Sequence, residues 1–292
     1  MMDINYELYK VFYHVANTLS FSEASKQLFI SQSAVSQSVK VLEKKLNQPL
    51  FIRSTKRVQL TPEGEILLKH IEPAMNLIKQ GENQLLEANT LNGGQLRIGA
   101  SDTICRYYLV NYLKEFHRQY PNVHIKVTNQ TSIECTKLLA SGQVDFCITN
   151  YPNSGLSNTQ NIRVIHEFYD VFVTNGEYAA ILGRKTTLKA LQQYPILMLD
   201  RKSTTSEFLH SMFQRHQLDL VPEIELSSND LLIDLARIGL GIAFVPDYCI
   251  PQTTTDLFIV NLEEHLPSRQ MVVVYNDNLP LSQAAKQFVS ML

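Results

Sequence analysis

A long helical pattern that starts at Pro62 divides this chain of 292 residues into two parts. Thr61 supplies a capping hydroxyl, Pro62 suits the first helical position, and Glu63 puts an acid in the first turn. Apolar or small residues then recur at steps of four and three, as in a heptad seam: Leu67, Ile71, Ala74, Ile78, Gly81, Leu85 and Ala88. The pattern predicts a helix of about 28 residues, roughly 40 Å long. Such a helix needs a partner along its seam, either a second subunit or a surface of the same chain.

Two residues are expected to weaken this helix. Pro73 lacks the N–H that an interior helical position donates, so we expect a kink or a break near Ile71. Gly81 has a low helix propensity. After the helix, Asn92-Gly93-Gly94 predicts a hinge. These features divide the chain into three predicted units: an N-terminal domain at residues 1–61, a linker helix at 62–91 and a C-terminal domain at 92–292.

The residues before the long helix have the pattern of three short helices. The first has an apolar face that recurs at three- and four-residue steps: Leu8, Val11, Phe12, Val15 and Ala16. Ser22 is expected to cap a second helix that ends near Phe29, and Ser31 is expected to cap a third. The third helix has its own apolar face: Val35, Val39, Leu42 and Leu46. Two short helices joined by a tight turn are typical of a helix-turn-helix.

The opposite face of the third helix carries short polar side chains, which suit the major groove of DNA. Gln can bond adenine through two hydrogen bonds, Ser can serve either base, and Lys can reach phosphate or guanine. The candidate DNA-contacting residues are Ser31, Gln32, Ser33, Ser36, Gln37 and Lys40. The alternative reading of this pattern alone is an ordinary surface helix with a solvated face.

A basic hairpin is predicted directly after the third helix. Strand-like runs at residues 50–53 and 57–60 flank a short polar turn. Three cations would then lie beside the sugar-phosphate backbone, where contacts fix register rather than read sequence: Arg53, Lys56 and Arg57. The alternative is a solvated charged turn. Although the net charge of the chain is −2, residues 20–60 hold seven basic residues and two acidic ones, a local surplus that attracts phosphate.

In order and spacing, this segment resembles the DNA-binding domain of the LysR-type bacterial transcriptional regulators. The matching residues are Ser22–Ala24, Leu28, Ser31–Gln32, Ala34–Ser36, Leu42–Glu43, Leu50–Phe51, Arg53 and Leu60–Gly64. The sequence departs from the family pattern at Ser25, where a second Ala is usual, at Ser33, where Pro is common, and at Asn47, where Gly is common. Because Ser33 lies on the reading face, its departure is expected to change base preference rather than the fold.

The resemblance implies several partners. The long helix becomes a linker that pairs two subunits, so we expect a homodimer or a homotetramer, because two recognition helices read two half-sites. The nucleic-acid partner is double-stranded promoter or operator DNA, and RNA polymerase is a further candidate partner. Without a signal pattern or an apolar run of membrane-spanning length, we expect a cytoplasmic protein with no membrane partner.

The last two hundred residues alternate between strand and helix patterns. The predicted strands lie at residues 96–100, 123–128, 144–149, 196–199, 224–226, 241–245 and 271–275. The predicted helices lie at residues 107–118, 134–141, 208–216 and 231–238. Such alternation implies an α/β fold with a parallel sheet.

This half resembles the LysR-type effector domain, a two-lobed α/β domain shaped like a periplasmic binding protein. The matching pieces are Leu96–Gly99, Phe116, Tyr120–Pro121, Val123, Gly142, Val144–Asp145 and Gly239–Pro246. We expect the chain to cross between lobes near residues 164–172 and 266–271. The expected lobe I covers about 95–164 and 268–292, and lobe II covers about 165–267.

Polar residues follow several of the predicted strands. Ligands of open α/β sheets bind beyond the carboxyl ends of the strands, and hydroxyls with N–H groups at helix starts suit anions. The candidate effector-binding residues are Ser101, Asp102, Thr103, Thr131, Thr149, Arg201, Ser203 and Thr204. They predict a small, anionic metabolite held between the lobes. The alternative is that they are ordinary turn residues and helix caps.

Other classes of protein have less support. The sequence lacks a G-x-S-x-G elbow, a P-loop and an H-E-x-x-H helix, so we expect no enzyme, no cofactor and no metal. A hydrolase or transferase on the C-terminal half is an alternative that no motif favours. A ligand carrier fits poorly with the basic N-terminal domain, and a nucleoid protein needs no large ligand domain. The four cysteines are expected to be reduced core residues, with a redox switch through Cys135 and Cys147 as the alternative.

Overall fold

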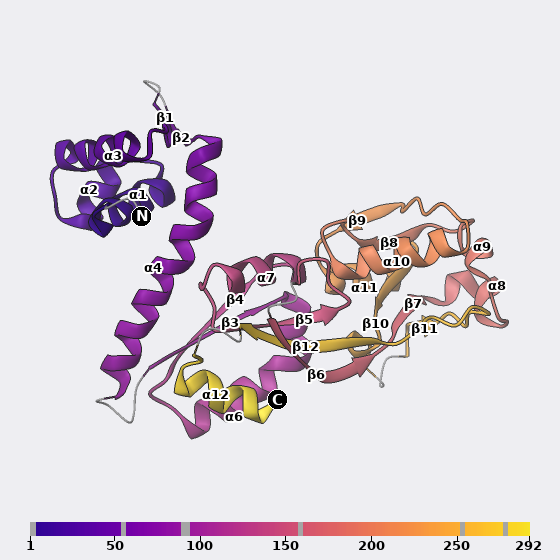
Figure 1. Ribbon diagram of the computed structural model, residues 1–292. Coiled ribbons are helices and arrows are strands. Elements are labelled where there is room, and N and C mark those ends of the chain that lie inside the picture. Colours follow the sequence, from indigo (N-terminus) through magenta and orange to yellow (C-terminus); the bar gives the residue numbers. More distant parts are fainter. Residues whose placement is uncertain (1–3, 54–56, 89–93, 157–159, 252–254, 277–279) are drawn as a thin grey trace. The chain divides into compact units, whose positions relative to one another are not determined.

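The computed structural model describes residues 4–53, 57–88, 94–156, 160–251, 255–276 and 280–292 (Figure 1). These residues form two compact units, of which the first holds the chain up to Asn89 and the second holds most of the rest. Among the described helices, none is both long enough and apolar enough to cross a membrane.

Three helices and a short antiparallel hairpin form the core of the first unit. Their bounds are α1 Tyr6–Thr18, α2 Phe21–Leu28, α3 Gln32–Leu46, β1 Phe51–Arg53 and β2 Val58–Leu60. The predicted apolar faces meet in this core, where Phe12, Val15, Val35, Val39 and Leu42 are fully buried. The three helices and the hairpin are therefore confirmed.

The start of α2 differs from the prediction. Ser20 has an extended backbone, and its side chain accepts a hydrogen bond from the Glu23 N–H at 3.2 Å. The predicted cap, Ser22, lies inside the first turn instead. A cap must stand outside the helix with a non-helical backbone, and Ser20 meets this condition two residues earlier.

The helix α4 begins where the sequence indicates and spans Pro62–Ala88. The Thr61 hydroxyl accepts a hydrogen bond from the Gly64 N–H at 3.0 Å and donates one to the Pro49 carbonyl at 2.7 Å. Thr61 therefore caps α4 and also ties it to the segment that leads into β1. The predicted hinge at residues 92–94 lies largely outside the described residues.

The expected break near Ile71 is wrong, because α4 continues through Pro73. An interior proline removes one backbone hydrogen bond and crowds the preceding turn. The turns before Pro73 are held in place by Leu67, Leu68 and Ile71, which pack against the core of the first unit. This packing maintains the helix where the local sequence would weaken it.

The first sheet of the second unit has the order β4-β3-β5-β12-β6. Its strands are β3 Gln95–Ala100, β4 His124–Asn129, β5 Phe146–Tyr151, β6 Gln160–Phe168 and β12 Arg269–Asn276. On one face α6 (Val110–Gln119) and α12 (Gln283–Met291) pack through Phe116 and Phe288. On the other face α7 (Ser132–Ala140) packs through Cys135 and Leu139, which gives a three-layer lobe (Figure 1).

The second sheet has the order β11-β7-β10-β8-β9 and forms a second three-layer lobe. Its strands are β7 Asp170–Thr174, β8 Ile196–Leu199, β9 Ile224–Leu226, β10 Ile242–Pro246 and β11 Phe258–Ile259. On one face α10 (Thr204–Arg215) packs through Leu209 and Phe213. On the other face α11 (Asn229–Arg237) packs through Leu232 and Ala236. The short helices α8 (Ala179–Leu182) and α9 (Leu188–Leu191) complete this lobe.

The sheets are mixed rather than parallel throughout. In the first sheet β3 pairs parallel with β4 and β5, whereas β12 runs antiparallel to β5 and β6. In the second sheet β8 pairs parallel with β10 and β9, whereas β10 runs antiparallel to β7. The chain leaves the first sheet after Phe168 and returns to it at Arg269. At each crossing the chain arrives from the other lobe and enters the sheet as an antiparallel strand. The simple alternation of strand and helix therefore does not hold at these points.

Candidate DNA-binding face and ligand pocket

The helix α3 presents the predicted polar face to solvent. Gln32, Ser33, Gln37 and Lys40 are exposed and Ser36 is half-buried. The Ser31 hydroxyl caps the helix by accepting a hydrogen bond from the Ala34 N–H at 3.2 Å, and it lies 2.9 Å from the Ser33 hydroxyl. The structure thus brings the six predicted residues onto the start and the open face of one helix.

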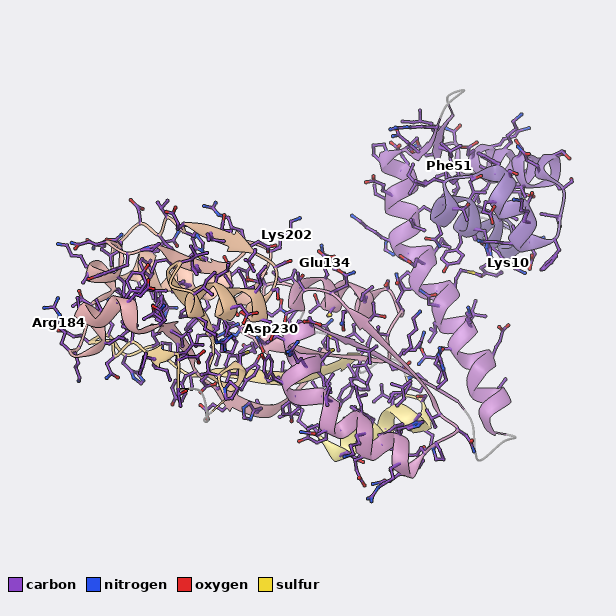
Figure 2. All side chains as sticks on the ribbon, turned by 180° about the vertical axis from the view of Figure 1, so that it is seen from behind. Lys10, Phe51, Glu134, Arg184, Lys202 and Asp230 are labelled. Atoms are coloured by element: carbon purple, nitrogen blue, oxygen red, sulfur yellow. The ribbon has the colours of Figure 1, made fainter. Side chains whose placement is uncertain are left out.

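Glu43 links this helix to the hairpin. Its Oε1 accepts hydrogen bonds from the Leu50 N–H at 2.9 Å and from the Phe51 N–H at 3.2 Å. The Phe51 ring, labelled in Figure 2, packs on Phe12 and Phe21 with ring centroids 5.5 and 5.9 Å apart. These contacts fix the first strand of the hairpin against α3, so the two elements that would contact DNA are held together.

The basic tip of the hairpin is only partly described. Arg57 is exposed just before β2. Lys56 and the side chain of Arg53 lie outside the described residues. Their proposed contacts with the DNA backbone therefore stay a prediction from the sequence.

A cavity of about 230 Å³ lies between the two lobes of the second unit. Six of the eight predicted effector-binding residues line it: Ser101, Asp102, Thr103, Thr131, Ser203 and Thr204. Glu134, Lys202 and Asp230, labelled in Figure 2, mark the starts of three helices around this junction, whereas Arg184 lies at the far end of the second lobe. The carboxyl ends of strands from both sheets thus meet at one pocket.

Four helix starts converge on this cavity. Side-chain oxygens that line it accept hydrogen bonds from backbone N–H groups one turn later: Ser101 from Ile104, Thr131 from Glu134, Ser203 from Ser206 and Ser228 from Leu231. The first of these helices is α5 (Asp102–Ile104), which continues through a π-helical turn, η1 (Cys105–Leu109), into α6. Helix N-termini carry partial positive charge and unpaired N–H groups, so their convergence favours a negatively charged group.

Two predicted residues lie elsewhere. Arg201 is exposed on the turn before α10 and is not among the lining residues. Thr149 is fully buried and is also absent from the lining, and its hydroxyl accepts a hydrogen bond from Asn153 Nδ2 at 2.6 Å. Among the described residues that line the cavity, none is basic, while Asp102 and Asp200 are acidic. Partial positive charge at this cavity therefore comes from the backbone N–H groups of the helix starts rather than from a basic side chain.

Ten further residues line the cavity. They are Asn129, Gln130, Ser132, Asn150, Leu199, Asp200, Thr205, Ser227, Ser228 and Asn229. Ser227 to Asn229 directly follow β9. The rule that ligands bind at the carboxyl ends of strands identifies these residues when it is applied to β9 as well. Thr205 carries the same signal, because it belongs to the polar run after β8 that also contains Ser203 and Thr204.

Direct contacts join the lobes beside the cavity. Asn229 Nδ2 donates a hydrogen bond to the Thr103 hydroxyl at 2.9 Å. Next to it, the Tyr107 hydroxyl donates to Asp230 Oδ1 at 2.6 Å, and Arg106 Nε lies 3.3 Å from the same oxygen. Burial, followed by the contact with Asp230, raises the pKa of Tyr107 well above its usual value. The lobes are therefore bridged on this side by polar contacts between α11 and the helix that starts at Ser101.

The four cysteines are free thiols, three of them buried and Cys105 half-buried. Burial raises the pKa of Cys105 to about 11, with a smaller contribution from Asp102. Burial likewise raises the pKa of Cys135 to about 12 and that of Cys147 well above its usual value. Thiols with such pKa values are protonated at neutral pH and react slowly.

A winged helix-turn-helix joined to a two-lobed domain with a polar pocket defines a DNA-binding protein that also binds a small molecule. Residues 6–65 match the family model described as bacterial regulatory helix-turn-helix protein, lysR family. Residues 89–292 match the model described as LysR substrate binding domain. The chain belongs to the LysR family of transcriptional regulators, which are not enzymes.

Two known proteins resemble the chain over nearly its whole length, and a third resembles about two thirds of it. The HTH-type transcriptional activator CmpR of a Synechocystis species is 26% identical over 286 residues, which is 97% of this chain and 93% of CmpR. The crystal structure of full-length CbnR complexed with its target DNA matches with a TM-score of 0.67 and 16% identity, covering 98% of each chain. The regulatory domain of Synechocystis CcmR in complex with 2-PG matches with a TM-score of 0.62 and 20% identity, covering 68% of this chain and 95% of that domain.

Proposed function

We propose that this regulator responds to a small, anionic metabolite bound between the lobes of its second unit. The observation that carries the proposal is the convergence of four capped helix starts on a cavity of about 230 Å³. Hydroxyls and backbone N–H groups then bind the anion without a basic side chain. The 2-PG complex of the related CcmR domain supports a ligand of this size.

The DNA-binding assignments complete the proposal. The residues 1–61 form the DNA-binding domain, 62–91 the linker helix, and 92–292 the effector domain. Ser31, Gln32, Ser33, Ser36, Gln37 and Lys40 contact base edges or nearby phosphates, and Arg53, Lys56 and Arg57 clamp the backbone. The target is an interrupted palindrome in a promoter, bound by a homodimer or homotetramer in the cytoplasm, with RNA polymerase as a further partner.

The mechanism is a shift between two states. Effector in the cavity changes the angle between the lobes, and this change alters the relative placement of paired recognition helices and the bend in the DNA. Only a ligand that binds the two states with different affinities can drive such a shift.

Calorimetric titration of the full chain tests the ligand class. We expect at least one small acid among inorganic phosphate, 2-PG, malonate and 2-oxoglutarate to bind, and neutral glycerol to give no signal. Ser101→Ala and Thr103→Ala should each weaken binding by roughly tenfold, the loss of one hydrogen bond to a charged group. Ser290→Ala, on the exposed side of α12, is the control that should change nothing. No binding of any acid, or unchanged affinity in both pocket variants, would contradict the proposal.

The charge of the ligand has its own test. Asp102 lines the cavity, so Asp102→Asn removes a repelling carboxylate and should tighten the binding of every acid that binds. A uniform loss of affinity in Asp102→Asn would instead mean that this carboxylate accepts a hydrogen bond from the ligand.

A further inference from the structure

A buried ion pair lies where the chain crosses between the lobes. Arg269 is the first residue of β12, Asp170 is the first residue of β7, and both side chains are fully buried. Arg269 Nη1 donates a hydrogen bond to Asp170 Oδ2 at 2.8 Å. In the sheet register Arg269 lies opposite Phe168, the last residue of β6. The pair therefore ties the returning strand to the outgoing one at both crossings.

The surroundings of this pair are unusual for two charges. The Arg269 guanidinium carbon lies 5.5 Å from the ring centroid of Phe168 and 5.0 Å from that of Phe208 on α10. Among the described residues, Arg269 Nε and Nη2 and Asp170 Oδ1 have no hydrogen-bond partner. Two buried and incompletely paired charges are a weak source of stability. Such a pair is better suited to favour one arrangement of the crossing strands over another.

The same arginine reaches the wall of the cavity. Its Nη1 also donates a hydrogen bond to the Thr205 hydroxyl at 3.2 Å. Thr205 lies in the first turn of α10 and lines the cavity together with Thr204 and Ser203. A continuous set of contacts therefore runs from the cavity, through Thr205 and Arg269, to the two crossing strands.

We propose that Arg269 is a positioning residue that transmits occupation of the cavity to the crossing strands through Thr205. The inference rests on the proposed function, because it requires a ligand in the cavity. A ligand seated at the start of α10 moves Thr205, and Arg269 has unpaired N–H groups with which to take up a second arrangement. The lobe angle then depends on whether the cavity is filled.

The experiment uses a fluorescent reporter at the crossing. The chain contains no tryptophan, so an introduced one reports alone. Tyr169 lies between β6 and β7 and is 45% exposed, which makes Tyr169→Trp a mild change. The emission of this full-length variant is recorded during titration with inorganic phosphate, 2-PG, malonate and 2-oxoglutarate. Calorimetry on the same samples measures binding separately.

Three substitutions are compared in the Tyr169→Trp background. Thr205→Val removes the hydroxyl that Arg269 contacts but keeps the shape of the side chain. Thr205→Ser retains the hydroxyl and should behave like the parent. Thr174→Val is the matched control, because Thr174 is a buried threonine of the same lobe whose hydroxyl donates to the Gly241 carbonyl at 3.2 Å, outside the cavity lining.

We expect an acid to bind the parent and its three variants with affinities that differ by no more than about tenfold, since at most one hydrogen bond is lost. At saturation the emission change should fall by more than half in Thr205→Val and persist in the other two variants. A full emission change in Thr205→Val, or no change in the parent despite binding, would overturn the inference and leave the proposed function intact. Absence of calorimetric binding to the parent would instead overturn the proposed function, and the inference with it.

Discussion

Asn47 shows how a single residue can depart from the family pattern without changing the fold. It ends α3 with φ 53°, in the left-handed region that glycine adopts freely and that asparagine tolerates better than most residues. Ser33 is exposed on the open face of the same helix, so we expect its departure from the usual proline to change the surface offered to DNA. The first departure concerns backbone conformation, and the second is expected to concern recognition.

Base reading and backbone clamping should be separable at the residue scale. Gln37→Ala should lower the preference for the selected site over random duplex by about 1–3 kcal/mol, because bidentate base contacts are lost. Lys56→Ala should weaken binding to the selected site and to random duplex alike, and it should reduce the slope of log affinity against log salt by about one. Fluorescence anisotropy at several salt concentrations measures both effects, with Gln48→Ala, beyond the end of α3, as the control. Equal effects of Gln37→Ala on both DNAs would remove its assignment as a reader.

The cysteines should be unreactive in the folded protein. A pKa of about 11 for Cys105 and about 12 for Cys135 means that both are protonated at pH 7.5, and their thiolates form only as the pH rises toward those values. A colorimetric disulfide reagent should therefore modify the native chain slowly at pH 7.5 and faster with rising pH. The guanidinium-unfolded chain should react at all four thiols. Rapid modification of the native chain would favour the redox alternative.

At the element scale, two glycines test the packing of α4. A Cβ on Gly64 would lie 2.2 Å from the Leu50 carbonyl oxygen, whereas a Cβ on Gly81 would meet nothing within 4 Å among the described residues beyond its own helical backbone and chain neighbours. Gly64→Ala should therefore destabilise the first unit by about 1–3 kcal/mol through overpacking. Gly81→Ala should stabilise α4 by about 0.5–1 kcal/mol through helix propensity. Urea unfolding, monitored by circular dichroism, measures the free energy of unfolding of both variants. Equal changes in the two variants would contradict the close packing at Gly64.

Most elements with a clear apolar period were predictable from the sequence. The faces of α1 and α3 follow steps of three and four residues, and the buried strands β8 and β10 are short apolar runs. β6 was missed because it is an edge strand of mixed polarity, with Ile162 and Val164 exposed. Its pairing with β12 joins residues about a hundred positions apart, and local patterns carry no information about such contacts.

The pocket was predictable in position but not in charge balance. The carboxyl-end rule located six of its lining residues. Arg201 follows the same strand as the capping residue Ser203, yet it points to solvent. The direction of a side chain within a turn depends on the turn geometry, which the sequence pattern does not specify. Thr205 and Arg269 meet only because the fold brings α10 to the crossing strands.

At the scale of the whole molecule, α4 should join two subunits. Large apolar side chains are exposed along it, among them Ile66, Ile78 and Leu85, with Ile78 58% exposed. Ile78→Glu should convert the oligomer to a smaller species and weaken DNA binding by at least tenfold, because one half-site contact is lost. Ile78→Leu keeps the apolar surface and should preserve the assembly. Sedimentation velocity at micromolar concentration measures the size of the assembly in both variants. An unchanged assembly in Ile78→Glu would place the interface elsewhere.

We expect this chain to be a sequence-specific regulator whose DNA binding responds to a small acid. Selection of binding sites from random duplex DNA by the purified full-length protein, at fixed near-physiological salt and with and without the four acids, tests it most directly. We predict enrichment of a short inverted repeat with an interrupted centre, and a change in affinity for that repeat when an acid is present. Salt-sensitive binding without any enriched sequence, under either condition, would contradict the account.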